Sequence, residues 1–392
     1  MVTKPPVLII NSYGGSITLA ATQEGHPILA SCEDHNFGLD SQRLNFPHLN
    51  YRSELADWDL DMDLKGAIVI AHPPCAAFSS QNRGSASKRG PGAEAFACTT
   101  RLLEHVMPRR PEAVAIESVP GALEGARHVH DFYAAAHGYD LYRVLQNAAS
   151  FGVPQWRRRF WAIFVKQQPG RKREFTFVLN HNVRYLNDVL GVDAAEGELD
   201  ITHTTRWGKQ LDLLKELGYT EKSLRELLSG TTTYGNIIHI LAEAHGYEHT
   251  KGWPPFGKLH DYIVDGNFLS GALHVLNPNG LAPVLLGPCW WWLGKRQLGY
   301  ADYKQIMGFP ADYRYHKPRL TFVLLSKGVC PPVARWILQE ISANVFNIAR
   351  PATCDLDVVD SYISDRSQVV TISPGETADL RTPEKWRERP KS

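Results

Sequence analysis

Short apolar runs alternate with helix-like segments between residues 6 and 165, and this alternation limits the fold more than any other feature of the chain. Strands that alternate with helices favour a parallel sheet with helices on both faces. We therefore predict an α/β fold, a doubly wound and mostly parallel sheet, over residues 1–168. The predicted strands are VLII at 7–10, PILASCED at 27–34, AIVIAHPP at 67–74, EAVAIESV at 112–119 and RRRFWAIFVK at 157–166.

The ends of the predicted strands carry reactive side chains. Sheets of this kind bind ligands beyond the carboxyl ends of their strands, and Glu33, Cys75 and Glu117 stand at three such ends. A thiol nucleophile needs exposure and a fixed direction. Two prolines stiffen the backbone directly before Cys75. Taken alone, Cys75 could equally be a small buried residue at a strand end.

Composition indicates a globular chain whose net charge is too small to create a strong electrostatic potential over the whole protein. The chain has 392 residues and a formal net charge of +1, so overall charge does not favour nucleic acid, although a local basic face is compatible with it. Six scattered cysteines without a CxxC pair indicate reduced thiols. The sequence has no signal-peptide layout and no apolar run of bilayer length. We expect a soluble, cytoplasmic protein.

Beyond residue 168 the pattern of apolar and polar residues changes twice. Residues 169–294 are irregular and rich in aromatics, which predicts a second, smaller lobe. Residues 295–350 return to helical patterning, and the polar tail 351–392 is expected to be partly disordered. His245 and His249 are four apart, but a poor helix and the lack of a third ligand lead us to expect no metal site.

Three segments in chain order resemble the cytosine-C5 DNA methyltransferase family. The family's Pro-Cys-Gln-x-Phe-Ser corresponds to residues 74–79, PCAAFS, and its Glu-Asn-Val to 117–119, ESV. Its Gln-x-Arg-x-Arg corresponds to 155–159, QWRRR. Residues 296–313 and 326–334 resemble two later family segments. The resemblance covers roughly 6–165 and 295–345, and it implies that 169–294 is the target-recognition lobe and that 295–350 completes the catalytic domain.

The resemblance implies the chemistry of the cytosine site. The Cys75 thiolate would add to C6 of a flipped cytosine, so that C5 attacks a one-carbon donor. Glu117 would hold N3 and the exocyclic amine, and Arg157 or Arg159 would hold the O2 side, with Gln155 in the same set. The partner would be double-stranded DNA. The basic loop 79–92 would contact its phosphates through Ser79, Arg83, Lys88 and Arg89.

The donor side departs from the family pattern. The family's Asp-Leu-Phe-x-Gly-x-Gly-Gly is LIINSYGG at 8–15, and Lys327 stands where the family has Asn. A lysine beside a sulfonium donor is unfavourable, whereas a donor with a carboxylate would be favoured. An outward-pointing Lys327 without a role is the alternative. The predicted donor residues are Ile10, Ser12, Gly14, Gly15, Glu33, Asp34, Glu54 and Lys327.

Several hypotheses about function stay open on the sequence alone. The donor could be S-adenosylmethionine, a carboxy-S-adenosylmethionine giving carboxymethylcytosine, or a methylene-folate or formaldehyde source giving hydroxymethylcytosine. The chain could also be an inactive DNA-binding homologue, or act on RNA, as one branch of the family does. The family's usual range implies a monomeric modification enzyme of a bacterium or its phage, with or without a restriction partner.

Overall fold

The computed structural model describes most of the chain outside residues 192–272. The described residues are 3–33, 36–52, 62–79, 89–170, 173–191, 218, 220, 273–276, 279–284, 290–293, 296–316, 318–351, 367–383 and 386–387. Within these ranges no helix is long and apolar enough to cross a bilayer.

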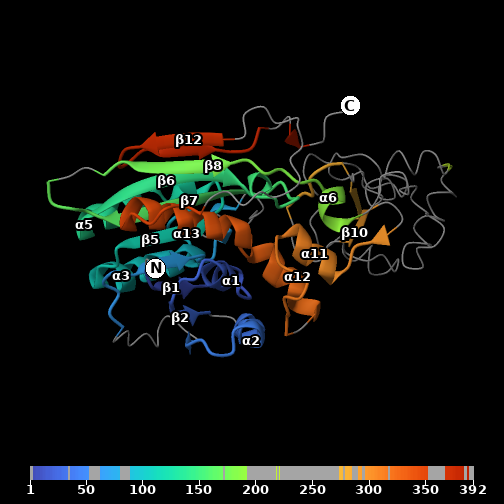
Figure 1. The fold of residues 1–392 in the computed structure, drawn as a ribbon, viewed down its shortest axis with the longest axis horizontal. Helices are drawn as coiled ribbons and strands as arrows, with labels where there is room; N and C mark the ends of the chain where they lie inside the picture. The colour runs from blue at the N-terminus through green and yellow to red at the C-terminus, as the bar shows by residue number, and fades with distance from the viewer. Residues whose placement is uncertain are drawn as a thin grey trace.

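An eight-stranded sheet forms the centre of the protein (Figure 1). Its order is β13-β6-β7-β5-β4-β1-β2-β3, and β7 alone among these strands runs antiparallel to both of its neighbours. The prediction of a doubly wound, mostly parallel sheet is confirmed. The strands are β1 (Val7–Ile10), β2 (Ile28–Cys32), β3 (Tyr51–Arg52), β4 (Ile68–Ala71), β5 (Ala113–Ser118), β6 (Tyr139–Asn147), β7 (Arg158–Lys166) and β13 (Thr377–Leu380).

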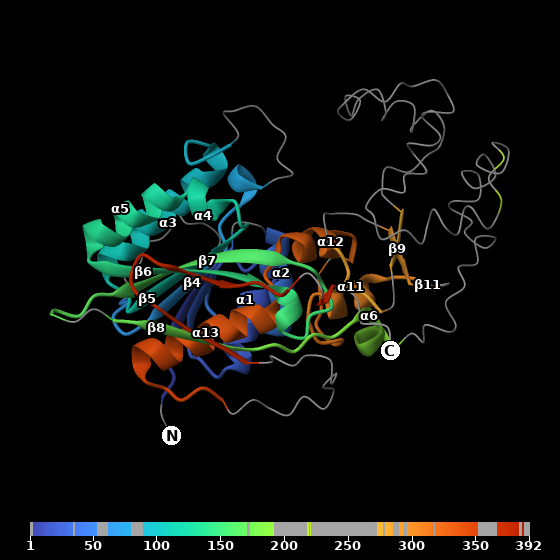
Figure 2. The same cartoon turned by 90° about the horizontal axis from the view of Figure 1, so that it is seen from above.

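Helices cover both faces of this sheet (Figure 2). Side chains alternate across a strand, so in β1 Val7 and Ile9 enter one core while Leu8 and Ile10 enter the other. The first core is closed by α1 (Ser16–Gln23), α13 (Pro331–Phe346) and β8 (Phe175–Asn180), and the second by α3 (Glu94–Val106) and α5 (Arg127–His137).

The remaining elements lie around these layers. They are α2 (Asn36–Asn45), α4 (Ala122–Gly125), α6 (Leu186–Leu190), α11 (Tyr300–Ile306), α12 (Pro318–Lys327) and a small sheet of β9 (Leu273–Leu276), β10 (Trp290–Leu293) and β11 (Arg296–Gln297). Residues 175–180, which the sequence places in the middle lobe, pack into the first core instead, because Phe175, Phe177 and Leu179 are buried there. The His245 and His249 pair lies outside the described residues.

The strand order reverses between β1 and β4. From β1 the chain continues to β2 on one side, and from β4 it continues to β5 on the other. Loops leave the carboxyl ends of these two central strands in opposite directions, which opens a crevice for ligands. The segments at this crevice are Asn11–Gly15 after β1 and His72–Cys75 after β4.

Part of the polar tail belongs to the fold, so the expectation of disorder is wrong for residues 367–383. Strand β12 (Ser367–Ile372) pairs with β8, and β13 extends the main sheet in parallel with β6. Ile372, Ala378 and Leu380 are buried in the first core. The apolar alternation of these two short strands is masked by their polar neighbours, and their hydrogen-bonding partners lie far away in the sequence.

Candidate active site

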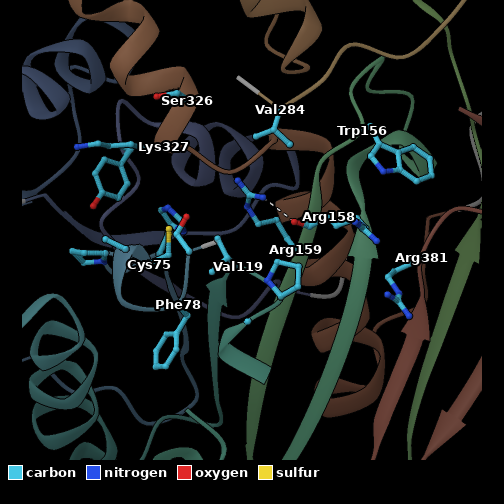
Figure 3. Close-up of a pocket in the computed structure, with 17 residues that line it drawn as sticks. Cys75, Phe78, Val119, Trp156, Arg158, Arg159, Val284, Ser326, Lys327 and Arg381 are labelled. Carbon is cyan, nitrogen blue, oxygen red and sulfur yellow. Dashed lines mark hydrogen bonds between the residues drawn. The ribbon is translucent and has the colours of Figure 1, made fainter. Parts of the chain in front are cut away.

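Cys75 lines a cavity at the switch point of the sheet (Figure 3). His72 N donates to Ile10 O at 3.0 Å, so sheet pairing ends just before the two prolines, which cannot donate. Cys75 then has φ −95° and ψ 2° and precedes a short 3₁₀ turn, Ala76–Phe78. This bridge region is often occupied by active-site residues. The cavity volume of about 910 Å³ falls in the range of ligand sites.

Glu117, at the carboxyl end of β5, is held between two basic side chains. It is 0 % exposed. Arg159 Nε lies 3.0 Å from its Oε1, and His72 Nδ1 contacts its Oε2. Neither carboxylate oxygen accepts a well-aligned hydrogen bond from a described residue. Both oxygens can therefore accept hydrogens from a ligand that reaches them past His72 and Arg159, which line the cavity.

The two reactive groups have opposite protonation tendencies. Burial would raise the pKa of Glu117, but the neighbouring His72, Arg159 and Arg157 outweigh it and lower that pKa. Burial and the negative charge of Glu117 raise the pKa of the Cys75 thiol, and Arg159 and Arg157 oppose them only in part. The ligand-free site therefore holds a Glu117 carboxylate and a protonated Cys75.

The two predicted arginines have different surroundings. Arg157 is 1 % exposed, and its Nη2 donates to the carbonyls of Ser326 (3.1 Å) and Gly328 (2.6 Å). Burial and the nearby Arg159 lower the pKa of Arg157 to about 10, so it stays charged at neutral pH. Arg159 lines the cavity. Arg157 thus ties the start of β7 to the C-terminal segment, and Arg159 is the arginine beside the reacting groups.

Gln155 is also removed from the cavity. Its side chain is fully buried, and neither amide atom has a hydrogen-bond partner among the described residues. Its predicted catalytic role stays a prediction.

Three predicted donor residues are buried in the turn after β1 and at the end of β2. Ser12 Oγ accepts from Ile17 N (3.0 Å) and Thr18 N (3.3 Å), which satisfies donors at the start of α1. Glu33 Oε2 accepts from Tyr13 N at 2.6 Å. Ile10 has no exposed surface. These contacts shape the turn, and a direct donor role for the three residues stays a prediction.

The two glycines of this turn make room for tyrosines of the C-terminal segment. Gly14 and Gly15 have φ of +86° and +99°. A Cβ on Gly14 would lie 3.0 Å from the Tyr315 ring, and one on Gly15 would overlap the Tyr313 hydroxyl, which donates to Gly14 O at 2.6 Å. The space on the Cβ side of these two glycines is thus occupied by tyrosine side chains, and the donor role of Gly14 and Gly15 stays a prediction.

The methyl donor implied by the resemblance is S-adenosylmethionine, and the cavity at Cys75 offers space and polar side chains for its reacting end. Tyr13, Ser326 and Lys327 line the same cavity as Cys75. Lys327, the last residue of α12, is exposed there (Figure 3). Asp34 and Glu54 lie outside the described residues. Among the described residues no group of three side chains could hold a metal ion.

The DNA-contact residues are described in part. Ser79 lines the cavity, Arg89 is exposed at the edge of the described loop, and Arg83 and Lys88 lie outside the described residues.

Sequence reasoning gave no role to four further side chains of the cavity. His72 could have been noticed in the sequence, because it stands three residues before Cys75 in the string HPPC. Arg381 could not, because only the structure shows that this residue of the tail lines the cavity. The four are His72, Trp156, Arg158 and Arg381.

Fold and site define a doubly wound α/β protein with a cysteine-centred cavity at its switch point. The family model for C-5 cytosine-specific DNA methylases matches residues 10–343. The chain therefore belongs to the C-5 cytosine-specific DNA methylase family, and the resemblance seen in its motifs is confirmed.

Individual relatives are distant. The chain is 29% identical over 154 residues to the type II methyltransferase M.HgiDI of Herpetosiphon aurantiacus, covering 38% of this chain and 48% of that protein. The match thus spans about half the length of this relative.

Solved structures share the fold. One, from an E. coli prophage and described as a DNA modification methyltransferase, has a TM-score of 0.52 at 18% identity, covering 88% of this chain and 100% of that one. The methyltransferase EhMeth of Entamoeba histolytica has a TM-score of 0.53 at 10% identity, covering 87% and 98%.

Proposed function

We propose that the protein modifies cytosine at C5 in double-stranded DNA, most simply by methyl transfer from S-adenosylmethionine. The observation that carries the proposal is Cys75 in a cavity beside the Glu117–Arg159 pair, in a chain of the C-5 cytosine-specific DNA methylase family. Such a protein would act on DNA in the cytoplasm of a bacterial cell, as a bacterial or phage modification enzyme.

The side chains of the cavity divide the work on the base. Cytosine C5 is a weak nucleophile until a thiolate adds to C6, and Cys75 Sγ supplies that thiolate. Glu117 holds N3 and the amine, so that negative charge does not accumulate on the ring. Arg159 faces the O2 side and stabilises developing charge. Because these groups are recessed, the base must leave the duplex to reach them.

The donor, when bound, supplies the one-carbon electrophile. Tyr13, Ser326 and Lys327 would hold its reacting end. Lys327 adds a positive charge to a cavity that Arg158 and Arg159 also line. This charge supports a donor with a carboxylate as the second candidate, carboxy-S-adenosylmethionine, because like charges repel a sulfonium. A methylene-folate or formaldehyde source is the third.

Mass spectrometry of nucleosides from the DNA of an expressing bacterial host tests the product. We expect 5-methylcytosine from the wild type and from Lys327→Asn, with no new nucleoside from an empty-vector host. A carboxymethyl or hydroxymethyl product would contradict S-adenosylmethionine as donor while keeping the cytosine chemistry. Loss of such a product in Lys327→Asn would assign the altered donor to Lys327. Unmodified DNA in every host would favour the inactive DNA-binding homologue.

Arg158 and Arg381 supply a basic rim for DNA. Asn147 of β6 pairs with Arg158, and Leu380 of β13 pairs with Gln146, so the two arginines flank the same end of β6. Both line the cavity. Arg381 directly follows β13, is exposed and forms an ion pair with Asp379 of that strand. We propose that this rim contacts phosphates next to the flipped base.

Arg381→Gln is expected to weaken DNA binding without changing which cytosines are modified. Removal of one phosphate contact should lower the slope of log affinity against log salt by about 1. Fluorescence anisotropy across a salt series measures it. Arg110→Gln is the matched control, because Arg110 precedes β5 and so lies at the amino ends of the parallel strands, away from the cavity at their carboxyl ends. An unchanged slope in Arg381→Gln would remove Arg381 from the DNA contact.

A further inference from the structure

The register of the sheet places His72 directly beside Glu117. In the parallel pair β4 and β5, Ala71 pairs with Ile116, so His72 and Glu117 are the next residues in register. His72 is 2 % exposed, and its Nδ1 contacts Glu117 Oε2. The ring of Tyr13 packs edge-on against the imidazole, with 5.1 Å between centroids. The imidazole is therefore fixed with Nδ1 towards the carboxylate.

The proposed reaction needs a proton that Glu117 does not hold by itself. When Cys75 adds to C6, electron density moves towards N3, which must be protonated or firmly hydrogen-bonded. The lowered pKa of Glu117 keeps it a carboxylate in the ligand-free protein. Its other charged neighbours, Arg157 and Arg159, stay protonated in proteins. Among the described residues that contact Glu117, His72 carries the side chain that can both take up and release a proton, which an arginine does not do.

We propose that His72 is a positioning residue that loads Glu117 with the proton delivered to cytosine N3. The inference rests on the proposed function. His72 does not touch the base: it acts through the Nδ1–Oε2 contact, and Glu117 touches N3. Arg159, at the other oxygen, holds the carboxylate in place during the transfer.

The proton balance of the step closes without a further reactant. It starts from the Cys75 thiolate, whose proton has passed to solvent. The Sγ–C6 bond forms, the Nδ1–H bond of His72 breaks, and an O–H bond forms on Glu117. That O–H bond then breaks as N3–H forms, which leaves His72 neutral and the ring an enamine. At the end the C5 hydrogen leaves as a proton to solvent, its electron pair re-forms the C5–C6 double bond, and Cys75 leaves C6 as a thiolate. The other proton returns from N3 through Glu117 to His72.

The charged and titratable groups that face the His72–Glu117 pair come from four elements. Cys75 follows β4, Arg157 and Arg159 enter β7, and Tyr13 follows β1. Cys330, just before α13, also interacts electrostatically with Glu117. Burial raises the pKa of its thiol to about 11, so the thiol stays neutral.

Deuterium uptake at cytosine C5 tests the inference without any donor. After Cys75 adds, the enamine takes up deuterium at C5 from heavy water, and mass spectrometry of nucleosides counts it. The substrate is genomic DNA from a host without cytosine modification. For the wild type we expect a bell-shaped pH profile. Its acidic limb rises as Cys75 ionises, and its alkaline limb falls as the proton that Glu117 must deliver to N3 becomes unavailable.

His72→Asn keeps a hydrogen-bonding side chain but cannot supply the proton. We expect its exchange rate to fall about 10²-fold, with the alkaline limb lost and DNA affinity kept. His26→Asn is the matched control. His26 is also buried, but it precedes β2 and so lies at the amino ends of the parallel strands, away from the cavity. If circular dichroism shows that His72→Asn is unfolded, His72→Gln replaces it.

The outcomes separate this inference from the proposed function. Wild-type rate and an unchanged pH profile in His72→Asn would overturn the role of His72 and leave the proposed function intact. Absence of exchange in the wild type would overturn the proposed function, and the inference with it. Exchange that persists in Cys75→Ser would do the same.

Discussion

Cys75→Ser is expected to abolish cytosine modification while leaving DNA affinity within about twofold of the wild type. A serine hydroxyl ionises far less readily than a thiol, in a site where burial already raises the pKa of Cys75. We expect the rate of modification to fall by about 10³-fold or more. Nucleoside mass spectrometry measures the product, and fluorescence anisotropy measures binding.

A second cysteine provides the control for this substitution. Cys98 lies in α3 and is half-buried like Cys75, but it does not line the cavity. Cys98→Ser should therefore modify DNA at the wild-type rate. If Cys75→Ser modifies DNA at the wild-type rate, the thiolate mechanism is wrong, whatever the donor is.

Gly15→Ala is expected to lower the free energy of unfolding by about 3 kcal/mol. The backbone there has φ +99°, which an L side chain rarely adopts, and the new Cβ would overlap the Tyr313 hydroxyl and lie 2.9 Å from Gln42 Cγ. Tyr313 is packed in the first core and cannot move away cheaply. Urea denaturation followed by circular dichroism gives the change in free energy.

Two variants separate strain from crowding at this turn. Gly25 also has a positive φ, +72°, but nothing lies within 4 Å of its Cβ position. Gly25→Ala should therefore cost only about 1 kcal/mol, the strain alone. Adding Tyr313→Phe to Gly15→Ala removes the overlapping oxygen and should restore part of the loss. Equal losses in the two glycine variants would show that crowding by Tyr313 does not matter.

The cytosine side of the site could be anticipated from strand ends alone. Cys75 and Glu117 follow apolar runs that are buried as β4 and β5, and parallel neighbours end at the same edge of a sheet. Once these two strands pair, the segments that follow them leave the sheet at the same edge, so Cys75 and Glu117 are expected in the same region. The positions of the motifs were therefore readable without coordinates, although their roles stay proposals.

Residues whose environment depends on distant segments could not be resolved in this way. Spacing treats Arg157 and Arg159 alike, yet the carbonyls of Ser326 and Gly328 capture Arg157 and leave Arg159 to Glu117. The sequence shows Gly14 and Gly15 in a turn, but only the structure shows that Tyr313 and Tyr315 lie where their Cβ atoms would be. Each outcome is set by a segment some 170 to 300 residues away along the chain.

The sequence by itself determined the class of sheet, the family and the side chains at the ends of its strands, because periodicity and local motifs are encoded by neighbouring residues. Tertiary structure decided which of those side chains meet. It paired His72 with Glu117 through the register of β4 and β5, and it brought Arg381 to the rim by adding β13 to the sheet. Register and strand order arise from hydrogen bonds and packing between segments far apart in the chain, which no local pattern specifies.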